Sequence, residues 1–500
     1  MRAAAKPESR RRRWGFRIGA MLVGLLGLGV VEVGLRVLHV GETAPSVDPF
    51  VSFRSVEPLF VPKGASGLME TSPDRRRCFQ AQTFARPKAP GTFRVFCFGG
   101  STVQGNPYGQ ETAFPRFLEL ALGTVDPSRR WEVINVGGLS YASYRVANLV
   151  RECLAYEPDL FVLCTGHNEF LEDRTYGKLK RSPAWMARAV RFASQLRLFN
   201  VMRQVAGGLR RDRRPVLREE VDALLDYEGG LKAYHDDPSW RSAVIAHFGN
   251  NVARMMAMSR DAGVPLILVT PVSNLRDTPP FKCEHSPALA GTDLWHWTNL
   301  VQQAETDLSH GRPDSAATAL EEATRIDPRH AQAWFRLGQV DLVLSRTNDS
   351  VTAFRQARET DVCPLRILGS MESAIARLAQ EHDVPWIDWQ AMIAGRSQSG
   401  IPGNDWLLDH VHPTPKGHML LAEALLVTMQ ARGWVTVRGD WLSACRARWE
   451  EHVAALPADY FEQGEEALAG LRAWTQGRAS GPSIDYRLFN RGKTDGGTGR

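Results

Sequence analysis

The chain has 500 residues, of which 43% are hydrophobic and 23% are charged. This is typical of a globular protein of two or three domains and excludes disorder over most of its length. Its 61 basic and 55 acidic residues give a net charge of +6, but residues 1–17 alone hold seven Lys or Arg and one Glu. The rest of the chain is therefore neutral, and the charge indicates membrane topology rather than a nucleic-acid partner.

An apolar segment follows this basic terminus. Its first fourteen residues, 18–31, carry no charge, and the segment is long enough to cross a membrane if Glu32 and Arg36 form a pair or reach the interface. No clear cleavage site follows. We therefore expect a signal anchor at 18–40 that crosses the cytoplasmic membrane once and leaves the following domains on the extracytoplasmic, periplasmic side. A cleaved signal peptide and a buried or interfacial helix are the alternatives.

Five short apolar runs, each bounded by turn signals and followed by a helical pattern, predict buried parallel strands. This alternation predicts a three-layer α/β/α domain of the flavodoxin-like kind with a five-stranded parallel sheet. In such sheets functional residues gather at the carboxyl ends of the strands. The five runs are 93–98, 132–136, 159–164, 265–270 and 385–389.

A basic insertion at 174–240 interrupts the alternation after the third strand. Its first part, 174–218, has thirteen basic residues and one acidic residue. Interleaved apolar residues predict one or two basic amphipathic helices. A solvated lid helix and a contact with anionic lipid headgroups or an anionic polymer are both open interpretations.

A second insertion, at 291–364, contains an internal repeat. The pattern of residues 316–328 recurs 34 residues later at 350–362. This spacing resembles that of the tetratricopeptide repeat, in which large residues fill the space between two helices and small residues let the helices approach. We expect two such repeats, 297–330 and 331–364, that pack on the α/β domain and offer a surface to a protein partner.

Loops that follow the predicted strands carry groups suited to nucleophilic catalysis. Ser101 lies in GGSTVQG after the first strand, at a helix start where free N–H groups favour negative charge. The second strand is followed by GGLSYASY, and the third by GHNEF, which contains Asn168. Asp409 and His412 lie in LDHVHPTPKG, near the end of the domain. Together these loops supply a nucleophile, oxyanion donors, a base and a carboxylate that orients the base.

The four motifs, in this order, resemble the four blocks of the SGNH (GDSL-like) hydrolase superfamily. The resemblance implies that Ser101 is the nucleophile, with Asp409 and His412 as its partners. It also implies an oxyanion hole made by the backbone N–H of Ser101, the side-chain amide of Asn168 and a backbone N–H from the second block.

The chain departs from the family pattern in three places. Gly100 replaces the Asp of GDS, and a Glu follows Asn168 where the family has Asp. The glycine of the second block is replaced by Ser140, whose N–H can serve if its backbone conformation allows; Gly138 is the alternative donor. The resemblance covers roughly 92–176, 245–275 and 385–430.

The resemblance implies an esterase that cleaves carboxylic esters through an acyl-enzyme. The substrate would be an ester-bearing small molecule, lipid or glycan of the cell envelope. An O-acyltransferase that moves an acetyl group to an envelope glycan with the same triad is the alternative. A second alternative is a scaffold with an inactive hydrolase domain that presents the repeats to a protein.

No cofactor and no metal ion are expected. The seven cysteines have no CxxC spacing, and one disulfide would be compatible with an extracytoplasmic location. His410 and His412 form an HxH pair in a loop with one Asp, which is a weak metal signal, and we expect His410 to be exposed. His167, beside the third-block asparagine, either lines the site or packs in the core.

The sequence thus predicts eight regions. They are a basic cytoplasmic terminus at 1–17, a transmembrane signal anchor at 18–40, a linker at 41–91, the first part of the hydrolase domain at 92–290 with its basic helical insert at 174–240, the repeat insert at 291–364, the second part of the hydrolase domain at 365–435, a helical extension at 436–476 and a disordered tail at 477–500.

Overall fold

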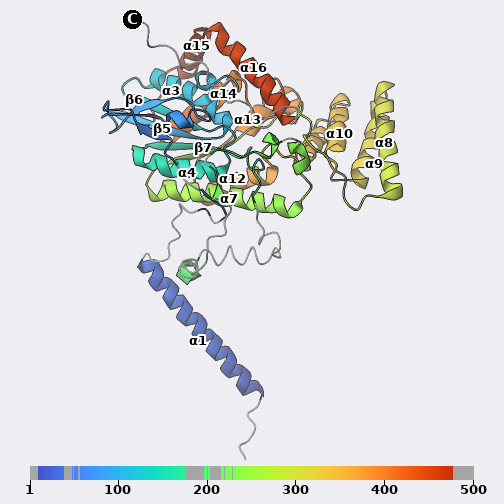
Figure 1. Cartoon of the computed structure of the whole chain (residues 1–500), viewed down its shortest axis with the longest axis horizontal. Coiled ribbons are helices and arrows are strands. Elements are labelled where there is room, and N and C mark those ends of the chain that lie inside the picture. The colour runs from blue at the N-terminus through green and yellow to red at the C-terminus, as the bar shows by residue number, and fades with distance from the viewer. Residues whose placement is uncertain are drawn as a thin grey trace, which may run out of the picture. The chain divides into compact units, whose positions relative to one another are not determined.

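The computed structural model describes most of the chain (Figure 1). Its described residues fall into two compact units, one within 1–50 and 176–215 and the other within 51–175 and 216–500. Most of the basic stretch 174–218 and all of the tail 477–500 lie outside the described residues, and the amphipathic helices and the disorder predicted there stay predictions. The described residues are 10–38, 48, 50–53, 57–174, 196–199, 201–202, 216–218, 220–227 and 229–476.

The first unit contains the long helix α1 (Arg10–Val37). Its segment Gly19–Val37 is long and apolar enough to cross a membrane, with a mean hydropathy of 1.9, and none of it is buried against other parts of the chain. The expected pair between Glu32 and Arg36 is present, with 2.9 Å between Oε1 and Nε. By length and composition, α1 therefore fits the predicted anchor, although a signal sequence would have the same properties.

The second unit is built on the predicted five-stranded parallel sheet. Its strand order is β10-β9-β7-β5-β6, and every neighbouring pair is parallel. All residues of β7 and β9 are buried, which explains why these strands read as continuous apolar runs rather than as alternating ones. The strands are β5 (Thr92–Gly99), β6 (Arg130–Gly137), β7 (Leu160–Cys164), β9 (Leu266–Thr270) and β10 (Trp386–Asp388).

Helices cover both faces of this sheet, as the α/β/α prediction requires (Figure 1). In β5, Val95 and Cys97 belong to the core that includes residues of α3 and α14. Phe98, on the opposite face, packs edge-on against Phe161 with ring centroids 5.0 Å apart. One face carries α3 (Phe114–Val125), α13 (Trp389–Ala394) and α14 (Pro415–Ala431), and the other carries α4 (Ser143–Cys153), α7 (Pro238–Asp261) and α12 (Gly369–Glu381).

The range 41–91, predicted as a linker, contains a small antiparallel sheet in the order β2-β3-β4. Phe60 in β2 and Phe84 in β4 pack edge-on with ring centroids 4.9 Å apart, and Phe84 also contacts Phe96 of β5. Strands of three or four residues are too short to show a periodicity, which is why the sequence did not reveal them. The strands are β2 (Phe60–Pro62), β3 (Leu68–Thr71) and β4 (Thr83–Ala85).

Four successive helices form the insertion in which two repeats are predicted. Gly338 lies so close to Phe354 that a Cβ atom on it would be 2.9 Å from the ring, which is the close approach that a small residue permits. Phe354 also packs with Leu275 and Ile401 of the sheet domain. The assignment to the tetratricopeptide class itself stays a prediction. The helices are α8 (Gly291–Ser309), α9 (Pro313–Ile326), α10 (Ala331–Val343) and α11 (Thr347–Glu359).

Two helices, α15 (Trp441–Ala454) and α16 (Ala458–Thr475), follow the sheet domain. Cys445 and Trp449 of α15 join the central core. The last turn of α16 reaches the carboxyl edge of the sheet, where the candidate site lies.

Candidate active site

Ser101 lies one residue beyond the end of β5, after Gly100, and is the first residue of the short helix α2 (Ser101–Gln104). The turn before it requires glycine, because a Cβ atom on Gly99 would lie 2.1 Å from the carbonyl oxygen of Cys164. A Cβ atom on Gly100 would lie 2.6 Å from Nδ2 of Asn168. The two glycines therefore let the loops after β5 and β7 touch, and this brings Ser101 and Asn168 into one site.

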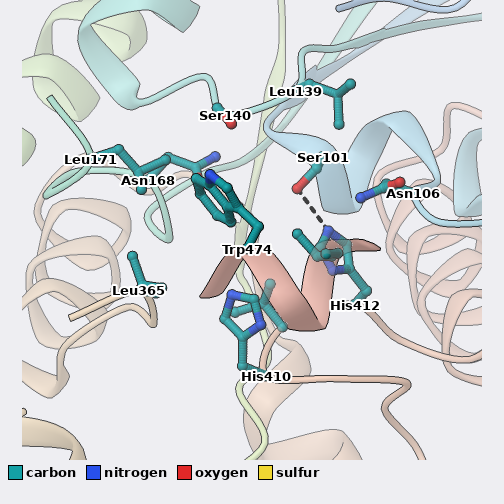
Figure 2. A pocket seen from close by; sticks show the side chains of 12 residues that line it. Ser101, Asn106, Leu139, Ser140, Asn168, Leu171, Leu365, His410, His412 and Trp474 are labelled. Carbon is teal, nitrogen blue, oxygen red and sulfur yellow. Dashed lines mark hydrogen bonds between the residues drawn. The ribbon is translucent and has the colours of Figure 1, made fainter. Parts of the chain in front are cut away.

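Ser101, His412 and Asp409 form a chain of hydrogen bonds, of which Figure 2 shows the bond between Ser101 and His412. Ser101 Oγ lies 2.8 Å from His412 Nε2, and His412 Nδ1 lies 2.7 Å from Asp409 Oδ2. The other carboxylate oxygen of Asp409 accepts the N–H groups of Val411 and His412, each at 2.8 Å. Both oxygens of Asp409 are thus engaged, and this fixes the orientation of the imidazole.

Electrostatics keep the Asp409 carboxyl ionised. Burial raises its pKa, but the neighbouring His412 and His410 and the hydrogen bonds it accepts outweigh burial and hold the pKa well below its usual range. An ionised Asp409 can only accept from Nδ1–H of His412, which leaves the Nε2 lone pair to accept the hydroxyl proton of Ser101. His412 is in this way set up as a base toward Ser101.

The two candidate donors of the second block differ in their hydrogen bonding. Gly138 donates its N–H to the carbonyl of Gly99 at 3.1 Å, so that group is already used. Ser140 has a φ of 60°, and among the described residues its N–H has no acceptor. A left-handed conformation is costly for a residue other than glycine, and such strain often marks a functional position.

Two contacts hold the loop around Ser140 in place. Asn168 Nδ2 donates to the carbonyl of Tyr141 at 3.1 Å, and Figure 2 shows this amide nitrogen on the side that faces Ser101. The buried carboxylate of Glu169 accepts from the N–H and the hydroxyl of Ser143, at 2.7 and 2.9 Å. Glu169, which stands where the SGNH pattern has Asp, thus supports the loop that carries Ser140.

A small cavity of about 40 Å³ adjoins Ser101. Most of its wall is apolar, and three of its residues come from segments that carry no motif: Leu365 follows the repeats, and Leu471 and Trp474 belong to α16. No sequence signal distinguishes Trp474 from the other 13 tryptophans of the chain. The lining consists of Ser101, Asn106, Leu139, Ser140, Asn168, Leu171, Leu365, His410, Val411, His412, Leu471 and Trp474.

Two other histidines near the site need comment. His410 was expected to be exposed, and this was wrong: it is 7% exposed and lines the cavity. Burial lowers the pKa of His410 to about 4, so the ring is neutral at pH 7. His167 packs instead, since its Nδ1 accepts the N–H of Ile367 at 3.1 Å.

The described part of the chain has no group of three His, Cys, Asp or Glu side chains placed to hold a metal ion. All seven cysteines lie within the described residues and are free thiols. Burial raises the pKa of Cys78 to about 11 and that of Cys97 well above its usual value. Neither thiol is therefore a reactive nucleophile at neutral pH.

Among the comparisons with known proteins, only the comparison with solved structures gives matches. No family model matches this chain, and neither does a curated protein. Among solved structures it is similar to the acetylxylan esterase Axe2 from Geobacillus stearothermophilus, with 12% identity, a TM-score of 0.30 and coverage of 69% of this chain and 97% of that one. It is also similar to a lipase/acylhydrolase from Enterococcus faecalis, with 13% identity, a TM-score of 0.30 and coverage of 69% and 99%. At this level of similarity the function has to be inferred from the site itself.

Proposed function

We propose that this chain is a serine hydrolase that cleaves carboxylic esters through an acyl-enzyme. The observation that carries the proposal is the continuous chain of hydrogen bonds from Asp409 through His412 to Ser101. It lies beside the Ser140 N–H, which has no acceptor among the described residues, and the Asn168 amide. A nucleophile, a base, an orienting carboxylate and oxyanion donors in one cavity are the parts that acyl transfer needs.

The reaction follows from these positions. Ser101 Oγ attacks the ester carbonyl while its proton passes to Nε2 of His412, and Asp409 stabilises the imidazolium. The negative charge that develops on the carbonyl oxygen is bound by the N–H groups of Ser101 and Ser140 and by the amide of Asn168. Collapse of this intermediate breaks the ester bond, and the leaving alkoxide takes the proton from His412.

Water completes the cycle. It loses a proton to His412 and attacks the acyl group on Ser101; the carboxylic acid leaves, and the hydroxyl of Ser101 recovers its proton. An alcohol in place of this water would make the same chain an O-acyltransferase. Release of free carboxylic acid in the absence of any added alcohol acceptor would favour the hydrolase over the O-acyltransferase.

The N-terminal helix α1 supports a proposal for the side of the membrane on which this activity is located. Basic residues precede the apolar segment and oppose translocation, so we propose that they stay in the cytoplasm and that the catalytic unit lies on the extracytoplasmic side of the membrane. The substrate would then be an ester-bearing molecule of the envelope. Protease digestion of intact spheroplasts should cleave the catalytic unit; full protection would contradict this topology.

The proposed chemistry is tested with the full-length chain, purified in detergent, and p-nitrophenyl acetate. Ser101→Ala and His412→Ala should lose at least about 10³-fold in kcat while they unfold at the temperature of the wild type. Ser128→Ala and His310→Ala, on exposed side chains, are matched controls that should keep wild-type turnover. Equal turnover in Ser101→Ala and the wild type would refute the proposal.

A further inference from the structure

The C-terminal helix α16 is attached to the catalytic domain along its whole length. At its start, the hydroxyl groups of Tyr460 and Thr112 lie 3.1 Å apart. In its middle, a Cβ atom on Gly464 would lie 2.0 Å from the ring of Tyr108. Near its end, Arg472 Nη2 donates to the carbonyl of Leu408 at 2.6 Å, next to Asp409. These contacts fix the position of the last turn relative to the catalytic residues.

The end of α16 places Trp474 in the wall of the cavity beside Ser101 (Figure 2), and Leu471 of the same helix also lines this cavity. The indole N–H of Trp474 donates to Oδ1 of Asp226 at 2.9 Å, which holds the ring in one orientation. The two side chains are 6% and 9% exposed, and they pack in one apolar cluster with Leu171 and Leu365. This wall is therefore apolar, held by tertiary contacts and independent of the four catalytic motifs.

The size of the cavity limits what can enter it. One water molecule needs roughly 10–15 Å³, so a cavity of about 40 Å³ has room for only a few heavy atoms. An acetyl group is small enough for this space, whereas a hexanoyl chain would have to displace the wall or extend through the open side of the cavity. Since the N–H of Trp474 is already bound to Asp226, the wall offers an apolar surface rather than a partner for a sugar hydroxyl.

We infer that Trp474 and Leu471 form the end of the acyl-binding side of the site and restrict the enzyme to esters of short acyl groups, of about acetyl size. The inference rests on the proposed esterase function. The acyl group is the part that belongs here, because it stays bound to Ser101 while the alcohol must leave and water must enter from the open side. Trp474 and Leu471 are specificity-determining residues in this role and take no part in the chemistry.

The experiment measures kcat/KM of the full-length chain for p-nitrophenyl acetate, butyrate, hexanoate and octanoate. The wild type should lose at least tenfold in kcat/KM from acetate to hexanoate. Trp474→Ala should raise the hexanoate-to-acetate ratio at least tenfold, since each methylene that finds an apolar site contributes roughly fourfold to binding. Leu471→Ala should raise it in the same direction, and it provides a second test if Trp474→Ala does not fold.

Three controls separate the possible outcomes. Trp295→Ala removes a tryptophan of α8 that is 68% exposed and should leave the ratio unchanged. Trp474→Phe keeps a ring in the wall without the bond to Asp226 and should retain the preference for acetate. If Ser101→Ala is as active as the wild type, or if the wild type hydrolyses none of the esters, the esterase proposal fails and the inference falls with it.

The inference alone is overturned if turnover depends on Ser101 but the wild type accepts hexanoate as well as acetate. It is also overturned if the folded Trp474→Ala and Leu471→Ala variants both keep the wild-type ratio.

Discussion

Replacement of Asn168 by alanine should isolate the contribution of one proposed oxyanion donor. The side-chain amide of Asn168 gives one hydrogen to the carbonyl of Tyr141, at 3.1 Å, and its nitrogen faces Ser101 (Figure 2). The substitution removes this amide and leaves the hydrogen bonds between Ser101, His412 and Asp409 untouched. Loss of one oxyanion donor typically costs about 10²–10³ in kcat, or about 2.7–4 kcal/mol in the barrier.

Loss of the hydrogen bond between Asn168 and Tyr141 affects the stability of the fold rather than the catalytic barrier. It should lower the free energy of unfolding by about 1 kcal/mol and has no direct effect on the barrier. Steady-state kinetics with p-nitrophenyl acetate and thermal unfolding of the same preparation therefore separate the two effects. We expect kcat to fall by two to three orders of magnitude and KM to change little, because the donor acts in the transition state.

Asn148→Ala, on α4, is the matched control, since its side chain accepts from Arg151 of the same helix. It should have wild-type kinetics. A kcat of Asn168→Ala within fivefold of the wild type would refute the assignment of Asn168 to the oxyanion hole. An increase in KM at unchanged kcat would also refute it, because it would mean that Asn168 only binds the ground state.

Further substitutions test the site and its surroundings. Gly100→Ala should lower kcat at least tenfold in the same assay, because the new Cβ atom would lie 2.6 Å from Nδ2 of Asn168 and displace the amide; wild-type kcat would mean that the amide position is not critical. Asp409→Asn should lower kcat by about 10⁴ at pH 7 with little change in the unfolding temperature, because a carboxamide holds His412 in the wrong tautomer; a loss below tenfold would contradict the role of the carboxylate. His418 has its pKa lowered to about 3 by burial, while an unfolded histidine has a pKa of about 6.5. Only the unfolded state then binds this proton between these values, so the wild type should lose stability as the pH falls through this range. His418→Asn, which keeps an acceptor for the local backbone N–H, should make urea unfolding less dependent on pH by up to about 1.4 kcal/mol per pH unit; an unchanged slope would contradict burial of a neutral ring.

The sheet could be predicted from the sequence because its central strands are buried on both faces. Runs such as 160–164 then contain apolar residues at every position, which is a strong local signal. The strands β2, β3 and β4 gave no such signal. They have three or four residues each, and their stability comes from packing against the larger sheet, which a local pattern does not contain.

The parts of the site with a motif could be predicted, and the parts fixed by tertiary packing could not. Ser101 and Asn168 lie in the loops that follow β5 and β7, so the strand pattern and the motif lead to them together. The choice between Gly138 and Ser140 depended on which N–H is already bound, a fact of the folded loop. Trp474 reaches the site only because α16 crosses the domain, and nothing near it in the sequence indicates this.

The position of His410 shows the same limit. A histidine in a polar loop is usually exposed, but here the loop turns its ring into the cavity, where it packs edge-on against Phe281 with centroids 5.2 Å apart. The direction of a loop side chain depends on neighbours that are far away in the sequence. The position of such a side chain can be determined only from the folded structure.

Covalent labelling of the full-length chain with a fluorophosphonate, followed by peptide mass spectrometry, tests the proposed nucleophile most directly. In the wild type the adduct should lie on Ser101, and in His412→Ala the rate of labelling should fall at least about 10³-fold because the base is gone. Labelling of another residue, or an equal rate in His412→Ala, would contradict a serine nucleophile activated by His412.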